Sequence, residues 1–229
     1  MNLNKEKKTL IEIIALTIVI LGITISSLFL FQKLFPETFE GFTGNAISSV
    51  RVVQTVPEPC NFTLYNGWNL ASFFCISIYQ NTTELFEPIS YNSIFMYDAS
   101  SYIDPWISYN PSLPNWTVQS LPETVSREQA FWISVSSDQN YYFNGSKKPS
   151  TTISLVDGWN LVGYPTSTSR NVSQAVLGIT GSFVQIKTFN NSAKTYDYYN
   201  GTNGTITNTS KYQGYWIEMN STGSWVVSW

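Results

Sequence analysis

The chain of 229 residues has no histidine, two cysteines and little charge, with Asp, Glu, Lys and Arg making up only 12% of it. The lack of histidine excludes Ser-His-Asp and Cys-His nucleophile systems and every histidine metal site. The formal net charge is −3 and no basic cluster follows the first eight residues, so the clustered cations that bind nucleic-acid phosphates are missing. There is also no P-loop, GxGxxG or HExxH motif. We therefore predict a protein that is not an enzyme and has no cofactor, no metal and no nucleic-acid partner.

A glycosidase that uses two carboxylates needs no histidine, so the lack of histidine does not exclude this class of enzyme. Five acidic residues lie between residues 98 and 138, and their spacing does not single out a catalytic pair. They are Asp98, Asp104, Glu123, Glu128 and Asp138.

Polarity comes instead from neutral side chains: 29 Ser, 23 Thr and 20 Asn. Ten Asn-x-Ser/Thr acceptor sites occur, about twice the number expected by chance, and an extracytoplasmic transferase would modify them. We predict N-linked glycans at these positions, although Asn81 and Asn171 also have the spacing of helix caps. The ten are Asn61, Asn81, Asn115, Asn144, Asn171, Asn190, Asn200, Asn203, Asn208 and Asn220.

One long apolar run, TLIEIIALTIVILGITISSLFLF, covers residues 9–31. As a helix it spans the roughly 30 Å hydrocarbon layer, and it exceeds the roughly 7–15 apolar residues of a cleavable signal. Lys5, Lys7 and Lys8 precede it, so the positive-inside rule places residues 1–8 in the cytoplasm. We predict a single-pass protein of the cell membrane with everything after the helix extracytoplasmic and with the lipid bilayer as a partner.

Glu12 is an ionisable residue inside this apolar run. It lies about one turn from the start, where its side chain can reach the interface. The segment KKTLIEIIALTIVILGI also resembles the start of type IV pilin-like proteins, and that resemblance implies that Glu12 pairs with a neighbouring subunit in a filament. Lys7 and Lys8 stand where that family has a glycine and an aromatic residue, so both interpretations remain open.

An internal repeat organises the rest of the chain. YNGWNL at 65–70 matches VDGWNL at 156–161, and FWI at 131–133 matches YWI at 215–217, in the same order and at nearly the same spacing. IFMYD and IKTFN lie at corresponding positions between them. This pattern predicts duplicated domains of about 85–90 residues.

Short apolar and aromatic runs with frequent turn signals predict strands in both copies. Asn66-Gly67 and Asp157-Gly158 predict hairpin turns. Asn81 and Asn171 predict the caps of short helices. The predicted strands are SIFMYDA, PWISY, AFWISV and NYYF in the first copy, and FVQIKTF, TYDYY, GYWIEM and SWVVSW in the second.

The fold class expected is therefore all-β: two tandem small β-sandwich or barrel domains after one N-terminal transmembrane helix. A stalk at 32–58 would lead to a domain at 59–145, and its repeat would fill 146–229, with 145–152 as the linker. The stalk includes 50–56, which is able to add an edge strand.

The repeats resemble a β module of archaeal and bacterial cell-surface proteins, with a GWNL segment, an aromatic-Tyr-Asp strand, a W-x-x-Y strand and a final GYWI segment. The carriers here are Gly67–Leu70, Gly158–Leu161, Tyr97–Asp98, Trp106 with Tyr109, and Gly214–Ile217. Ala130 replaces the glycine in the first copy, and Tyr196 replaces the tryptophan of W-x-x-Y in the second. The resemblance implies a surface-exposed, non-catalytic module.

Cys60 and Cys75 would face an oxidising compartment. A hairpin centred on Asn66-Gly67 places Cys60 opposite Phe73, one diagonal step from Cys75. We predict a disulfide between the two, with buried reduced thiols as the alternative.

Eight tryptophans invite a sugar-binding interpretation. Because Trp68 with Trp159 and Trp132 with Trp216 occupy equivalent positions, we expect these four in the core. Exposed contacts to a sugar or a partner are expected instead from Trp106, Trp116 and Trp229.

The function expected is that of a membrane-anchored, glycosylated surface protein with a structural or adhesive role. Its partners would be copies of itself or other envelope proteins. The alternatives are a pilin-like filament subunit and a carbohydrate-binding module.

Overall fold

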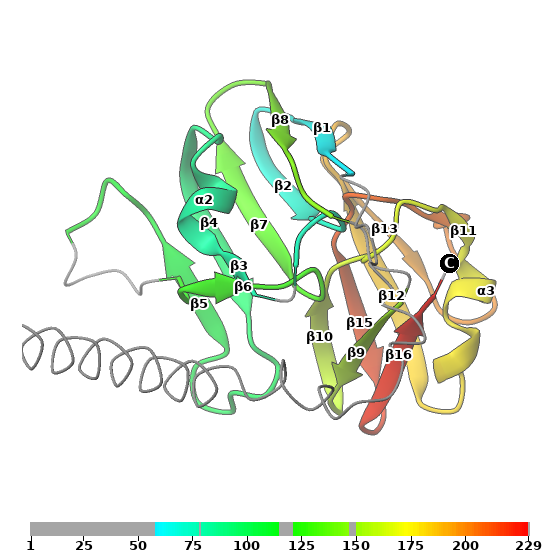
Figure 1. Ribbon diagram of the computed structural model, residues 1–229. Helices are drawn as coiled ribbons and strands as arrows, with labels where there is room; N and C mark the ends of the chain where they lie inside the picture. Colours follow the sequence, from blue (N-terminus) through cyan, green and yellow to red (C-terminus); the bar gives the residue numbers. More distant parts are fainter. Residues whose placement is uncertain (1–57, 78, 115–120, 147–149, 229) are drawn as a thin grey trace, which may run out of the picture. The chain divides into compact units, whose positions relative to one another are not determined.

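The computed structural model describes residues 58–77, 79–114, 121–146 and 150–228. Strands dominate these residues, which confirms the all-β class (Figure 1). No helix among them is long and apolar enough to cross a membrane. The predicted span at 9–31, Glu12 and the stalk up to residue 57 lie outside the described residues.

The first repeat contains eight strands and one short helix. They are β1 (Cys60–Leu64), β2 (Gly67–Ser72), β3 (Gln80–Asn81), α2 (Thr82–Phe86), β4 (Tyr91–Tyr97), β5 (Trp106–Tyr109), β6 (Thr124–Val125), β7 (Ala130–Val135) and β8 (Gln139–Phe143).

The second repeat has the equivalent strands and short helix in the same order, with one added 3₁₀ turn. They are β9 (Thr151–Leu155), β10 (Gly158–Val162), β11 (Arg170–Asn171), α3 (Val172–Ala175), the 3₁₀ turn η2 (Leu177–Ile179), β12 (Phe183–Asn190), β13 (Thr195–Tyr199), β14 (Asn208–Thr209), β15 (Tyr215–Met219) and β16 (Gly223–Val227).

Strand order is also the same in the two repeats. The four-stranded sheets run β2-β7-β4-β5 and β10-β15-β12-β13 (Figure 1). Each repeat adds two antiparallel pairs, β1-β8 and β3-β6 in the first and β9-β16 and β11-β14 in the second. Even an irregularity in register recurs, at Tyr91/Ser93 and at Phe183/Gln185. The duplication seen in the sequence is therefore present in the fold, while Gln54–Trp229 form one compact unit. The boundaries at 59–145 and 146–229 stay a prediction.

The predicted hairpins at Asn66-Gly67 and Asp157-Gly158 are wrong. β1 pairs with β8 and β2 pairs with β7, so the turn carries the chain from one sheet into another. Only the glycines have positive φ, +84° and +85°, whereas the type I′ turn needs it at both central residues.

The asparagine of the GWNL segment explains these corners. Asn69 is fully buried, and its side chain accepts from the Tyr65 N–H (2.8 Å) and donates to the Tyr65 carbonyl (2.7 Å). Asn160 makes the same two bonds to Val156, at 2.9 and 2.8 Å. Because this amide takes the place of a partner strand, the preceding strand is free to pair elsewhere.

Each repeat has its own apolar core. The first packs Phe73, Phe131 and Tyr141 with both cysteines, and the second packs Tyr164, Tyr215 and Trp225. The predicted linker at 145–152 is partly strand, because β9 begins at Thr151.

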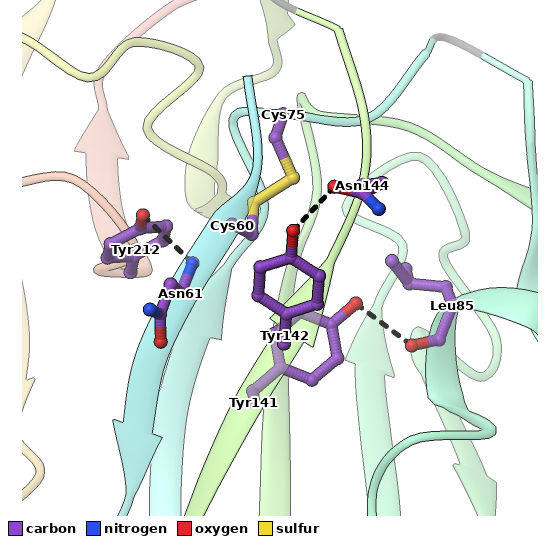
Figure 2. Close-up of a disulfide and its surroundings, with 8 residues drawn as sticks. All are labelled: Cys60, Asn61, Cys75, Leu85, Tyr141, Tyr142, Asn144 and Tyr212. Carbon is purple, nitrogen blue, oxygen red and sulfur yellow. Dashed lines mark hydrogen bonds between the residues drawn. A yellow bond between two sulfur atoms is a disulfide. The ribbon is translucent and has the colours of Figure 1, made fainter. Parts of the chain in front are cut away.

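The predicted disulfide is confirmed: Cys60 and Cys75 are bonded, with their Cα atoms 5.7 Å apart (Figure 2). The hairpin geometry used to predict it is wrong. Cys60 begins β1, whereas Cys75 lies in a turn beyond the end of β2. The backbone carbonyl of Cys75 accepts a hydrogen bond from the Ser146 N–H (2.7 Å). Both cysteines are fully buried.

Candidate functional site

Six aromatic side chains line an open cavity of about 530 Å³, which we call the aromatic groove. Four come from the first repeat and two from the second, and none carries a charge. They are Trp68 on β2, Phe95 on β4, Trp106 on β5, Trp132 on β7, Phe189 on β12 and Tyr196 on β13.

Strand alternation puts the four rings of the first repeat on the face of its sheet that points away from the core of that repeat. In β7, Phe131 and Ile133 are buried in that core, and Trp132 between them points the other way. In β4, Phe95 lies between the buried Ile94 and Met96. The sheet therefore has two apolar faces, one covered by its own repeat and one that meets the second repeat.

The contacts between the repeats are reciprocal. Trp132 packs on Phe189, with ring centroids 5.1 Å apart, and lies 6.3 Å from Tyr196. Trp216, its equivalent, packs on Tyr97 at 5.0 Å and lies 5.8 Å from Trp106. By strand register, Tyr97 corresponds to Phe189 and Trp106 to Tyr196. Each tryptophan thus inserts into the same pair of positions on the other repeat.

Backbone hydrogen bonds between the repeats are reciprocal in the same way. The Ser72 N–H donates to the Tyr212 carbonyl (2.8 Å), and the Gly163 N–H donates to the Glu128 carbonyl (2.7 Å). The isolated bridges Ala71↔Gln213 and Gln129↔Val162 are likewise equivalent. The two repeats therefore meet as the halves of an approximate two-fold dimer do.

Gly214 and Ala130 occupy equivalent positions at the centre of this interface. A Cβ on Gly214 would lie 2.7 Å from the Ala130 Cβ and 2.9 Å from Leu70. Leu70, Ala130, Leu161 and Phe189 form a small apolar cluster there. The two sheets can approach this closely because Gly214 and Ala130 are small.

The reciprocal contacts of the two repeats also break down at the aromatic groove. Phe95 corresponds to Lys187, whose Nζ lies 4.8 Å from the ring centroid of Trp159, the equivalent of Trp68. In the first repeat Phe95 meets Trp68 edge-on at 5.5 Å and leaves that tryptophan 41% exposed.

Lys194 lies at the Trp68 end of the groove. Its Nζ donates to the backbone carbonyl of Trp68 (2.9 Å), and its pKa is lowered by burial and partly restored by Asp138. Asp138 itself accepts from the Asn66 N–H (2.7 Å). These charges border the groove without lining it.

The four tryptophans predicted to lie in the core have a different place. Trp68, Trp132, Trp159 and Trp216 are not in the core of either repeat, because strand alternation places them on the face between the repeats. Trp106 is 40% exposed, as predicted. Trp116 and Trp229 lie outside the described residues. Trp225, which the sequence did not single out, is fully buried.

The predicted caps are confirmed. Asn81 accepts from the Glu84 N–H (3.1 Å) and Asn171 from the Ser173 N–H (3.0 Å), each through Oδ1. Because glycosylation uses Nδ2, capping leaves the modified atom available. The side chains of all nine described acceptor asparagines are exposed, and Asn115 lies outside the described residues.

None of the acidic residues that a glycosidase would use lines the aromatic groove: Asp98, Asp104, Glu123, Glu128 and Asp138. Asp98 accepts from the Ser100 N–H (2.9 Å) as a turn residue. Across the described ranges, no cluster of three acidic or cysteine side chains suits a metal.

Comparison with known proteins finds no matching family model, curated protein or solved structure.

Proposed function

We propose that this chain is a membrane-anchored, glycosylated extracytoplasmic surface protein with an adhesive role and no catalysis. The aromatic groove carries the proposal, since large exposed aromatic surfaces mark sites of interaction. Its uncharged lining offers a contact surface and no acid, base or nucleophile.

Two further observations support display outside the cell. The acceptor asparagines with a described environment are exposed, whereas the two fully structural asparagines, Asn69 and Asn160, are buried and lie outside acceptor sequences. The Cys60–Cys75 disulfide suits an oxidising compartment. We also propose that residues 59–145 and 146–229 are tandem β-sandwich domains on a tether.

Adhesion is tested with beads that carry the full chain in lipid nanodiscs, applied to envelope preparations and to each other. Native chain should attach, and Trp68→Ala/Trp106→Ala, which removes two exposed rings of the groove, should attach several-fold less. Equal attachment by both proteins would remove the groove from the proposed role.

Topology and modification are tested on native membranes. Externally added protease should digest residues after 33, and mass spectrometry of the peptides should find glycans on the acceptor asparagines. A soluble, sugar-free cytosolic product would contradict the proposal. Loss of residues 1–7 together with filaments in electron micrographs would instead favour the pilin-like alternative, which depends on Glu12.

A further inference from the structure

We infer that the aromatic groove binds a neutral glycan, with Trp68 and Trp106 as the platforms for sugar rings. This inference rests on the proposed adhesive function and names the ligand of its contact surface. The volume of about 530 Å³ lies within the range of small-ligand sites.

The lining indicates an uncharged ligand. A charged group that packed against the rings would lose part of its water and find no ion partner among the six of them. Aromatic faces do attract cations, but Lys194 already places its ammonium at the Trp68 carbonyl. A cationic ligand would meet like charge at that end.

The second repeat has a lysine that covers its tryptophan, and the described lining of the aromatic groove has no such lysine. In the second repeat Lys187 lies over Trp159, so the chain's own cation covers the ring that corresponds to Trp68. In the first repeat Phe95 takes the lysine's place at 5.5 Å from Trp68, and no cation among the described residues covers that ring, which is 41% exposed, whereas Trp159 is only half-buried. The duplicated surface therefore has an open binding position in one repeat.

The exposure of the rings indicates an amphipathic ligand. Trp68 and Trp106 are about four-tenths exposed, at 41% and 40%, and Tyr196 is 61% exposed. A pyranose presents one face of C–H groups to such rings and keeps its hydroxyls in water. A purely apolar ligand would leave much of its surface in water, because the cavity is open.

The platforms are also fixed before any ligand arrives. Trp106 stands edge-on to Phe95 at 6.3 Å and to Tyr97 at 5.1 Å, and Phe95 in turn holds Trp68. Rings that are held in this way lose little freedom on binding.

The test uses the full chain in nanodiscs, produced without N-glycosylation so that its own sugars do not compete. It is applied to an array of neutral oligosaccharides of glucose, galactose, mannose and N-acetylglucosamine, and hits are titrated by tryptophan fluorescence. We expect at least one class to bind, and Trp68→Ala and Trp106→Ala each to weaken binding about tenfold. Trp159→Ala, at the equivalent position of the second repeat, is the matched control and should bind like the native chain.

Thermal unfolding confirms that each variant is folded before its affinity is judged. No binding by folded native chain, or full binding by Trp68→Ala/Trp106→Ala, overturns the inference. Choline and a proline-rich peptide are titrated in parallel, and binding of either one in place of the sugars also overturns it.

The bead assay separates this inference from the proposed function. If the double variant loses attachment while no sugar binds the native chain, the adhesive role stands and the glycan is wrong. If sugars bind through Trp68 and Trp106 while attachment is unchanged, the glycan site stands and the adhesive role is wrong.

Discussion

Asn69 and Asn160 show how one side chain determines a local fold. Besides the bonds to the residue four positions earlier, each amide donates to a glycine carbonyl at 3.1 Å and to a carbonyl on the neighbouring strand at 3.4 Å. The GWNL segment therefore combines a glycine with positive φ, an outward tryptophan, a buried amide and a buried leucine.

Asn69→Ala should lower the free energy of unfolding by about 2–4 kcal/mol, because it removes a buried amide that bonds to part-buried backbone groups of Tyr65 and Gly67. Asn66→Ala is the control in the same turn, since Asn66 is exposed and lacks positive φ; its effect should stay within about 0.5 kcal/mol. Urea unfolding followed by tryptophan fluorescence measures both. Equal losses would show that the buried amide is not what holds the corner.

At the scale of elements, one aromatic side chain on a strand donates a hydrogen bond to each short helix. The Tyr141 hydroxyl on β8 donates to the Leu85 carbonyl (3.0 Å), as Figure 2 shows. On β16, the Trp225 Nε1–H donates to the Ala175 carbonyl (2.7 Å). A helix of four or five residues has little stability of its own, so these hydrogen bonds and the Asn caps hold it in place.

Because Tyr141 is buried, we expect the free energy of unfolding to fall in alkali. Burial raises its pKa well above the ordinary value near 10, so the folded state keeps the neutral phenol that the unfolded chain would ionise. Its contribution is complete below about pH 10 and declines as the pH rises above that value. The unfolding free energy should therefore fall between about pH 10 and 12.

Tyr141→Phe removes this titration and should flatten the decline, although its stability at pH 7 is lower by about 1–2 kcal/mol because the Leu85 carbonyl loses its donor. Tyr142→Phe, at an exposed neighbour, is the control. Urea unfolding at several pH values gives the comparison; the same alkaline slope in native protein and Tyr141→Phe would rule out Tyr141 as its source. Burial also raises the pKa of Tyr215 and of Tyr91, so a smaller alkaline slope should remain in Tyr141→Phe.

The disulfide stabilises the strand that opens the first repeat. It closes a separation of 15 residues, for which the chain-entropy estimate is about 3 kcal/mol. Cys60→Ser/Cys75→Ser should lose about that much in urea unfolding. Dithiothreitol should destabilise the native protein and leave the variant unchanged, and a native protein that is indifferent to reductant would contradict the estimate.

The elements were largely predictable from the sequence, and their partners were not. The predicted strands SIFMYDA and AFWISV correspond to β4 and β7 within about two residues, because period-two alternation is local. The partner of β1 depends on Asn69, a residue whose buried role has no local pattern. The outward position of Trp132 is readable from alternation with Phe131 and Ile133, but which face is buried by the second repeat is a long-range property.

At the scale of the whole molecule, the repeats depend on close contact near Gly214. Gly214→Ala should lower the free energy of unfolding by about 1–3 kcal/mol, because the new Cβ would press on Ala130 and Leu70. The exchange Ala130→Gly/Gly214→Ala moves the methyl group to the other repeat and should recover the part of the loss that comes from the contact with Ala130, while the contact with Leu70 stays. Gly178→Ala, where a Cβ meets nothing within 4 Å, is the control.

A double-mutant cycle of unfolding free energies measures this coupling. Additive losses in Ala130→Gly/Gly214→Ala would show that the two positions do not meet as described.

The Cys60–Cys75 disulfide also determines how a mechanical load would be transmitted through the covalent chain. Tension that enters from the N-terminal side reaches Cys60 and crosses the sulfur bridge to Cys75. The intervening residues 61–74, which include β1, β2 and Trp68, carry none of that load along the covalent chain. Tension applied at that end would thus strain the rest of the molecule before it deformed the segment that carries Trp68.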